Sequence, residues 1–343
     1  MLPEYIKFYH HALSPAEQDI YMQVYRNLKE RKRKFRVCLP EGTTLPDLLD
    51  IYKLVIRDTP AFFYVRTYHA QYQMCSTGFD VTPNYLYTDA EIDRLEKQAM
   101  VVIERFKAQY ITPDMSEYAR ELAIHDYLIE TVDYAHEIYK AKGVHDDEYI
   151  HNHPEIYTAL GPLLRHKAVC LGISLAFKLL CDCVRVKSFV VTGKTIWASG
   201  ADPGHAWNMV QLDGESYHVD ATWDIRTRTK RISCCYDYLN LNDQLIRFNH
   251  TWSSTRYPKC TALTYNFYRR YKLYVRTLDD IPALLSREYA KGRVYIPFKY
   301  ANAMPSNEEI LECIRKWVRA SAYNERYSWM ISRDLHNIYL KLG

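Results

Sequence analysis

The sequence lacks the segments that would mark a membrane protein or a disulfide-rich secreted protein. It has no run of about 18 apolar residues, the length that a membrane-spanning helix requires. The N-terminal stretch M-L-P-E-Y-I-K-F-Y-H-H has no apolar region typical of a signal peptide. The nine cysteines show no regular framework, which favours free thiols in a reducing compartment. We therefore expect a cytoplasmic protein, with the mature form of an exported protein as the alternative.

An excess of charge of one sign is also absent. The 45 Lys and Arg residues nearly balance the 41 Asp and Glu residues, so the formal net charge is only +4. This composition gives no case for a nucleic-acid partner or a membrane surface. No oligomeric state can be inferred from it.

Signals for a metal site are incomplete. No cysteines have the C-x-x-C…C-x-x-C spacing of a zinc site, and we interpret the paired ones as buried structural thiols: Cys181, Cys183, Cys234 and Cys235. The histidines of the tract His151-Asn152-His153 have no further ligand at metal-site spacing, and a solvated loop is the simpler interpretation. We expect neither a metal nor a cofactor.

What the sequence does contain is the composition of a globular protein, with 48% apolar and 25% charged residues over a length typical of two or three domains. We divide it into an N-terminal α+β region (1–112), a core (113–250) and a C-terminal α+β region (251–343). Capping patterns predict helices that begin after Ser14, Thr88 and Ser306. The stretch Ala61–Gln73 is interpreted as a long strand.

One cysteine, Cys170, stands where an apolar helical pattern begins. Apolar residues follow it at the i, i+3, i+4 and i+7 spacing of one helix face, at Ile173, Ala176, Phe177 and Leu180. A cysteine at a helix N-terminus faces unpaired backbone N–H groups and the positive end of the helix dipole, which favour the thiolate. Gly172 either leaves room for a substrate backbone or serves packing. Taken alone, an arbitrary cysteine such as Cys170 would be interpreted as a buried core cysteine.

A hairpin is predicted further along the chain. Asp213-Gly214 is a strong signal for a two-residue turn, and apolar or aromatic runs flank it. If these two residues form the loop, Trp207 lies opposite Asp220, and His205 lies opposite Thr222. His205 and Asp220 then share one face as diagonal neighbours, within side-chain reach. A three-residue loop would place them on opposite faces.

The aspartate and the histidine suit the cysteine chemically. A carboxylate beside an imidazole sets its tautomer and stabilises its protonated form, and the imidazole can then deprotonate a thiol. The short separations along the chain allow a helix that carries Cys170 to pack directly on a hairpin that carries His205 and Asp220.

These motifs resemble a known family. V-C-x-G-x-x-x-A-F and G-H-A-W-N-x-V-x-L-D-G-x-x-Y-H-V-D-x-T-W-D are similar to motifs of the transglutaminase-like superfamily of papain-fold thiol enzymes, in particular its bacterial branch. The resemblance covers residues 118–252 and includes A-I-H-D-Y-L-I at Ala123–Ile129 and D-Y-L-N-L-N-D at Asp237–Asp243. It implies a papain-like α+β core in which a helix that bears cysteine packs on an antiparallel sheet that bears histidine and aspartate.

The resemblance also implies catalytic roles. Cys170 would be the nucleophile, His205 the general base and acid, and Asp220 the residue that orients the histidine. Backbone N–H groups near Cys170 would bind the oxyanion, and Tyr157 and His166 are candidates for a second donor. The tryptophans Trp207, Trp223 and Trp252 would either shield the site from water or serve core packing. The papain-protease signature C-G-[SA]-C-[WY] is absent.

Three functions are compatible with this pattern. We expect a cysteine peptidase or amidase that cleaves a protein or peptide substrate through a thioester acyl-enzyme. A protein-glutamine transamidase, which would transfer the acyl group to a lysine amine, is the first alternative, although the acidic calcium-binding loops of animal transglutaminases are not recognisable. A non-catalytic peptide-binding module that retains the fold is the second.

Overall fold

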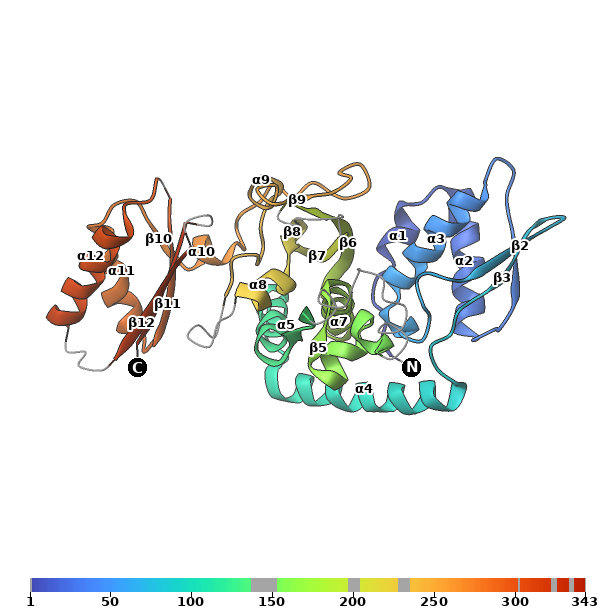
Figure 1. Ribbon diagram of the computed structural model, residues 1–343, viewed down its shortest axis with the longest axis horizontal. Helices are drawn as coiled ribbons and strands as arrows, with labels where there is room; N and C mark the ends of the chain where they lie inside the picture. The colour runs from blue at the N-terminus through green and yellow to red at the C-terminus, as the bar shows by residue number, and fades with distance from the viewer. Residues whose placement is uncertain are drawn as a thin grey trace.

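The computed structural model describes residues 2–136, 153–196, 204–227, 235–301, 303–321, 326–332 and 336–342. Helices and strands are mixed along the chain, which confirms the α+β class. The N-terminal and C-terminal regions lie at opposite ends of the long axis, and the core lies between them (Figure 1). The proposed domain boundaries near residues 112 and 250 stay a prediction.

The N-terminal region consists of helices around a small antiparallel sheet. Its elements are α1 (Phe8–Ala12), α2 (Pro15–Lys29), β1 (Phe35–Cys38), α3 (Leu45–Asp58), the short helix η1 (Pro60–Phe62), β2 (Gln71–Cys75), β3 (Gly78–Thr82) and α4 (Asp89–Tyr110). The strand order is β1-β3-β2. The helix starts predicted after Ser14 and Thr88 are confirmed, each with a reciprocal capping box to a glutamate three residues later.

The prediction of one long strand over Ala61–Gln73 is wrong. The chain forms η1 at Pro60–Phe62, and β2 begins only at Gln71. Residues 61–65 are all buried, and the Tyr64 hydroxyl donates a hydrogen bond to the carbonyl of Leu28. The run of apolar and aromatic side chains therefore reflects a tight turn inside the core, where burial alone decides composition.

The core packs one buried helix against an antiparallel sheet. Its elements are α5 (Glu117–Thr131), β4 (Asp133–Tyr134), the short helices η3 (Pro154–Tyr157) and η4 (Gly161–Arg165), β5 (Lys167–Ala168), α7 (Cys170–Cys183), β6 (Lys187–Thr195), β7 (His205–Leu212), β8 (Glu215–Val219), α8 (Ala221–Thr227), α9 (Asp243–Ile246) and β9 (His250–Thr251). The main sheet has the order β8-β7-β6-β9, and α7 contacts β6 and β7.

The N-terminal region is attached to the core by both stacking and polar contacts. The Phe8 ring stacks on Phe189 of β6 with 3.7 Å between ring centroids. The buried Lys178 ammonium on α7 donates to the carbonyl of Ile6 at 3.1 Å and pairs with Asp182 at 2.9 Å. Helix α4 extends along one side of the molecule from the N-terminal region to the core (Figure 1).

The C-terminal region forms a separate four-stranded sheet with three helices. Its elements are α10 (Phe267–Arg270), β10 (Tyr274–Val275), α11 (Asp280–Tyr289), β11 (Tyr295–Tyr300), α12 (Asn307–Ala320), β12 (Tyr327–Ser332) and β13 (Asn337–Leu342), with the strand order β10-β11-β13-β12. The predicted helix after Ser306 is confirmed with its capping box. None of the helices in the described part of the chain has the length and apolar content needed to cross a membrane.

Candidate active site

Cys170 is the first residue of α7, as predicted, and its side chain is partly exposed. The helix that carries it is held against β7 by a hydrogen bond from the side-chain amide of Asn208 to the carbonyl of Ser174, at 3.0 Å. A Cβ atom at Gly172 would lie 2.3 Å from the carbonyl oxygen of Ile156. Of its two possible roles, the structure therefore assigns Gly172 to packing between α7 and η3.

The hairpin has the predicted turn and register. Leu212 pairs with Glu215 and Met209 with His218, and the antiparallel ladder of β7 and β8 continues to Asn208 opposite Val219. Asp213 and Gly214 both have positive φ angles, 48° and 84°, as a type I′ turn requires. The side-chain faces therefore follow from the two-residue loop.

The predicted pairing of His205 with Thr222 is wrong, because β8 ends at Val219 and the chain turns into α8 at Ala221. Asp220 stands at this junction. Its Oδ1 accepts the backbone N–H of Trp223 at 3.1 Å, as a helix-capping carboxylate does. The helix start thus holds one oxygen of Asp220 and leaves the other free to point toward the sheet.

That other oxygen meets His205. Nε2 of His205 lies 2.6 Å from Oδ2 of Asp220, so the imidazole donates a short hydrogen bond to a carboxylate that is fully buried. His205 itself is 8% exposed and begins β7, opposite Gly193 of β6. With Nε2 engaged, Nδ1 is the ring nitrogen left for the thiol.

The charges of the three groups support one another. Burial favours a high pKa for Cys170, but a hydrogen bond with His205, the charge of His205 and a hydrogen bond from the Ala206 backbone outweigh it, and the pKa of the thiol is lowered. Burial opposes the charge on His205, yet Asp220 and Cys170 raise its pKa to about 10. The pKa of Asp220 is lowered by His205 despite its burial. A lowered thiol pKa beside an imidazole whose pKa is raised favours transfer of the thiol proton to His205, as a thiolate–imidazolium pair requires.

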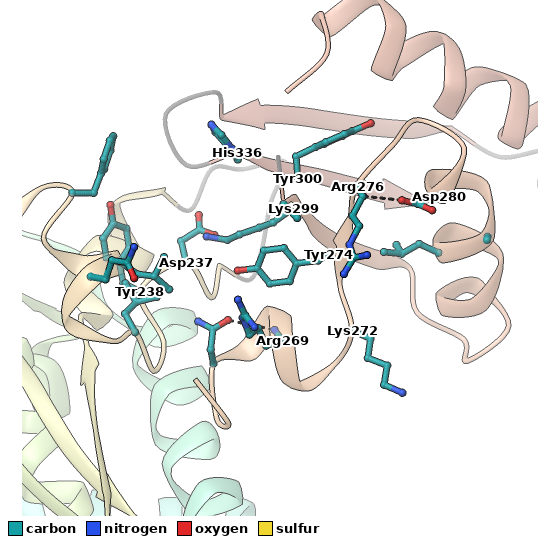
Figure 2. Close-up of a pocket in the computed structure, with 18 of the residues that line it drawn as sticks. Asp237, Tyr238, Arg269, Lys272, Tyr274, Arg276, Asp280, Lys299, Tyr300 and His336 are labelled. Carbon is teal, nitrogen blue, oxygen red and sulfur yellow. Dashed lines mark hydrogen bonds and ion pairs between the residues drawn. The ribbon is translucent and has the colours of Figure 1, made fainter. Parts of the chain in front are cut away.

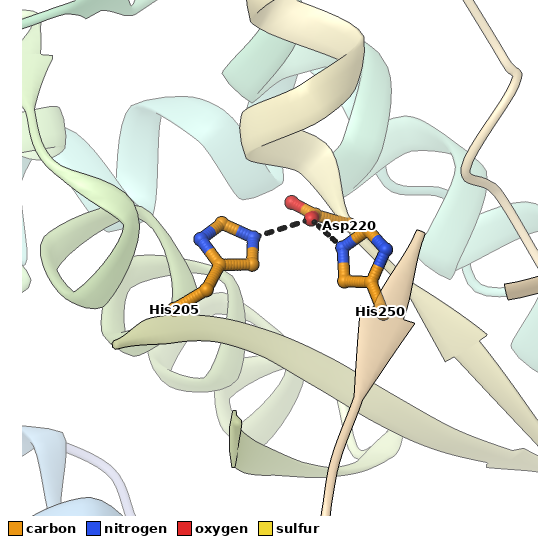
Figure 3. A group of neighbouring side chains, drawn as sticks. All are labelled: His205, Asp220 and His250. Carbon is orange, nitrogen blue, oxygen red and sulfur yellow. Dashed lines mark hydrogen bonds and ion pairs between the residues drawn. The ribbon is translucent and has the colours of Figure 1, made fainter. Parts of the chain in front are cut away.

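A further residue, His250, joins this group and was not anticipated from the sequence. It is fully buried on β9, and its Nε2 lies 2.9 Å from Oδ2 of Asp220, the same oxygen that His205 contacts (Figure 3). No spacing pattern connects a single histidine in N-H-T-W with an aspartate thirty residues earlier. Only the pairing of β9 with β6 brings the two together.

Aromatic rings enclose the imidazoles on several sides. Trp207, fully buried, stacks on His205 at 5.8 Å between centroids, and Trp223 meets it edge-on at 6.5 Å. Trp252 packs instead on His218, at 4.6 Å. Two of the three tryptophans considered from the sequence therefore contact His205, and the third belongs to a neighbouring cluster.

That neighbouring cluster contains the same three residue types. His218, Asp243 and Cys260 have ligand atoms within 4.8 Å of one another. Nε2 of His218 lies 2.9 Å from Oδ1 of Asp243, and Nδ1 of His218 accepts the indole N–H of Trp207 at 3.0 Å. No motif or spacing in the sequence indicates that Cys260 lies beside this pair.

Among the residues that the structure describes, two groups have a spacing compatible with a metal ion: His205, Asp220 and His250, and the His218 cluster. In both, the histidine nitrogens that face the carboxylate already lie at hydrogen-bond distance from it. Their polar atoms are thus satisfied by one another. The tract His151-Asn152 lies outside the described residues, and the expectation of no metal stays a prediction.

The candidate second oxyanion donors lie near the cysteine helix. Tyr157 ends η3, which contacts α7. His166 is exposed in a left-handed turn after η4, with φ of 54°. The structure adds a hydrogen bond from the backbone N–H of Ala206 to Cys170, which lowers the pKa of the thiol. Cys181 and Cys235 are buried as expected, Cys183 is partly exposed, and Cys234 lies outside the described residues.

A cavity of about 1220 Å³ lies between the core and the C-terminal region (Figure 2). Segment 237–249 forms one wall, and the basic residues Arg269, Lys272, Arg276 and Lys299 contribute to the other. Asp237 anchors the two regions there, because it accepts the hydroxyl of Tyr268 at 2.6 Å and lies 3.7 Å from Nζ of Lys299. Cys170, His205 and Asp220 do not line this cavity.

Comparisons with known proteins match the chain only in part. No protein-family model matches the sequence, and no curated protein matches it. Among solved structures, the chain is similar to "Crystal structure of a TGase", with a TM-score of 0.32 and 15% identity over 59% of this chain and 53% of the other. It is also similar to a "Putative Cysteine Protease from Cytophaga hutchinsonii", with a TM-score of 0.27 and 13% identity over 45% of this chain and 61% of the other. The chain thus spans little more than half the length of each. TM-scores this low carry no argument, and the case for a thiol site is made by the chain's own residues.

Proposed function

We propose that the protein is a thiol enzyme of the transglutaminase-like kind that cleaves a peptide or amide bond, with Cys170 as nucleophile, His205 as general base and acid, and Asp220 as the orienting carboxylate. One observation carries the proposal. A partly exposed cysteine at a helix N-terminus is bonded to a buried histidine, which a buried aspartate holds at 2.6 Å. Nucleophilic catalysis needs this arrangement of nucleophile, base and orienting group.

The chemical steps follow from acyl transfer. The Cys170 thiolate attacks the amide carbonyl, and the electron pair of the carbonyl moves to oxygen. The N-terminal backbone of α7 and the N–H of Ala206 lie beside the sulfur, where an oxyanion donor contributes about 3 kcal/mol. The imidazolium of His205 gives its proton to the leaving amine, and a thioester remains. Water, deprotonated by neutral His205, then releases the acid and restores the ion pair.

Labelling with a thiol-reactive probe tests the nucleophile without knowledge of the substrate. We expect iodoacetamide to alkylate Cys170 faster than the exposed Cys38 or the partly exposed Cys313 at pH 6 to 7, because the lowered pKa of Cys170 increases the fraction of thiolate. His205→Ala should remove this preference. Labelling of all three cysteines at similar rates would favour the non-catalytic binding module instead.

The acyl acceptor is tested with a peptide library and an amine probe. Hydrolysis predicts that the fresh carboxylate ends appear at the same rate with and without a primary amine. Incorporation of a dansyl amine into a glutamine donor, faster than release of its acid, would replace hydrolysis by transamidation, with the same three residues in the same roles. Wild-type protein and Cys170→Ser should be compared throughout, so that contaminating proteases are excluded.

A further inference from the structure

The Asp220 carboxylate holds two histidines on one oxygen. Nε2 of His205 lies 2.6 Å and Nε2 of His250 lies 2.9 Å from Oδ2, while Oδ1 accepts the N–H of Trp223 at 3.1 Å (Figure 3). A triad needs only the first of these contacts. The second histidine is fully buried beside the charged pair, where an imidazole with no task would be replaced at little cost by an apolar ring.

The protonation state of His250 follows from its surroundings. A carboxylate can only accept, so Nε2 of His250 carries a proton. Burial lowers the pKa of His250, Asp220 raises it and the charge of His205 lowers it, with a net lowering that favours the neutral ring. A neutral imidazole has a single N–H, and therefore Nδ1 of His250 must accept a hydrogen bond.

The partner of Nδ1 can supply that hydrogen. As placed, Oδ1 of Asn249 lies 2.6 Å from Nδ1 of His250, and Nδ2 of Asn249 lies 2.6 Å from the hydroxyl of Tyr238. The two ends of an amide have the same shape, so the network decides which is nitrogen. A neutral His250 requires the amide NH₂ to face Nδ1, and the amide oxygen then accepts the Tyr238 hydroxyl. Each group in the chain from Tyr238 to Asp220 is satisfied in this arrangement.

The backbone holds this second histidine as firmly as the first. His250 pairs with Thr195 at the end of β6, and the neighbouring Thr251 approaches Gly193 so closely that a Cβ at Gly193 would lie 2.1 Å from its carbonyl oxygen. Gly193 in turn pairs with His205. Both histidines are thus paired with one strand at positions two residues apart, and their Nε2 atoms meet the same carboxylate oxygen.

We propose that His250 is a second positioning histidine for the reaction, which fixes the plane of the Asp220 carboxylate through its Nε2–H and so keeps the imidazolium of His205 in place beside Cys170. The inference rests on the proposed function. With His250 and Trp223 both donating, the carboxylate cannot rotate. Without His250, the carboxylate keeps only its contacts with His205 and with the N–H of Trp223, and the orientation in which it accepts the 2.6 Å hydrogen bond of His205 is held less firmly.

The matched variants are His250→Phe, which fills the site without a donor, and His250→Gln, whose amide NH₂ reaches a position similar to that of Nε2. We expect His250→Phe to lower kcat about tenfold to a hundredfold, the effect of one charge-assisted hydrogen bond, with KM little changed. His250→Gln should restore most of the loss. A role in packing alone predicts the reverse order, because phenylalanine fills the space better.

A substrate-free readout separates this inference from the proposed function. Thiolate absorbance at about 240 nm, titrated in wild type and in each variant with Cys170→Ala as the blank, reports the pKa of Cys170. We expect His250→Phe to raise that pKa and His250→Gln to leave it near the wild-type value. Asn249→Leu, which leaves the histidine in place but removes its partner, should give a smaller rise in the same direction.

The outcomes are distinct. An unchanged thiol pKa and an unchanged kcat in His250→Phe would overturn the positioning role, even if Cys170 proves to be the nucleophile. A raised thiol pKa in His250→Phe with no peptide or amide cleavage by wild type would support the positioning of the ion pair and contradict the reaction assigned to it. Circular dichroism and thermal unfolding should accompany each variant, and Asn249→Leu serves if His250→Phe does not fold.

Discussion

Two groups in the described part of the chain combine a cysteine, a histidine and an aspartate, and they differ in what each histidine nitrogen faces. His205 gives Nε2 to Asp220 and leaves Nδ1 for Cys170. His218, on the adjoining strand, gives Nε2 to Asp243, but its Nδ1 accepts the indole N–H of Trp207. His218 therefore has no ring nitrogen left with which to take a proton from a thiol.

The thiols differ accordingly. The pKa of Cys170 is lowered by its contact with His205, although burial opposes this. Burial raises the pKa of Cys260, and the nearby Asp243 carboxylate raises it further. The same three residue types thus form a candidate nucleophile in one place and an inert thiol in the other. The hydrogen-bond partners of the histidine, and not the residue types in the group, make the difference between the two thiols.

The sharpest way to separate the two groups is to remove each sulfur. We expect Cys170→Ser to lower kcat by at least about 10⁴-fold, as loss of a catalytic nucleophile does. Cys260→Ala should retain kcat and KM, and lose stability by about 1 kcal/mol from the small cavity. Steady-state kinetics on the best substrate of a peptide library measure the first effect, and urea unfolding measures the second. Equal activity losses in both variants would remove the distinction.

The aspartates give the next largest contrast. Asp220→Asn should lower kcat by about 10⁴-fold, since an asparagine no longer stabilises the imidazolium or sets its tautomer. It should also raise the thiol pKa of Cys170, measured by the pH dependence of alkylation. Asp243→Asn, at the equivalent place in the other group, should leave kcat close to that of wild type. If Asp243→Asn proved as harmful as Asp220→Asn, the two groups would act as one network through Trp207.

A third buried group combines a histidine with carboxylates but has no thiol. We expect substitutions in this group to have the smallest effect on activity. Nε2 of His125 lies 2.9 Å from Asp224, and burial raises the pKa of the nearby Glu121 to about 8 from an ordinary value of 4.5, with Asn240 and His125 opposing. A raised carboxyl pKa stabilises the fold fully below the ordinary value and loses that contribution as pH rises. The free energy of unfolding of wild type should therefore fall between pH 4.5 and about 8.

Glu121→Gln should flatten this decline, because glutamine keeps the hydrogen bond with Asn240 at 2.8 Å and cannot ionise. Urea unfolding at intervals of half a pH unit measures the free energy of unfolding in both proteins. Glu104→Gln, on the exposed face of α4, is the matched control for loss of a negative charge. Parallel curves for wild type and Glu121→Gln would show that Glu121 is ionised at neutral pH. Activity should change little, which would set this group apart from the one around Asp220.

Local patterns were sufficient for several parts of the structure. The Asp213-Gly214 turn determined the side-chain faces of β7 and β8, and the capping residues Ser14 and Thr88 marked helix starts that the structure confirms. These features depend on residues within a few positions of one another. The long strand over Ala61–Gln73 was mistaken because a buried turn and a buried strand have the same apolar composition.

By itself, the sequence determined the helix that begins at Cys170 and the register of the hairpin as far as Val219, because backbone periodicity and turn chemistry act over short distances. Only the tertiary structure decided three contacts. Asp220 caps a helix, His250 on β9 contacts the same carboxylate, and the indole N–H of Trp207 donates a hydrogen bond to Nδ1 of His218. Such contacts join segments that lie far apart in the chain, and burial selects the hydrogen-bond partners there because an unpaired polar group inside the protein is costly.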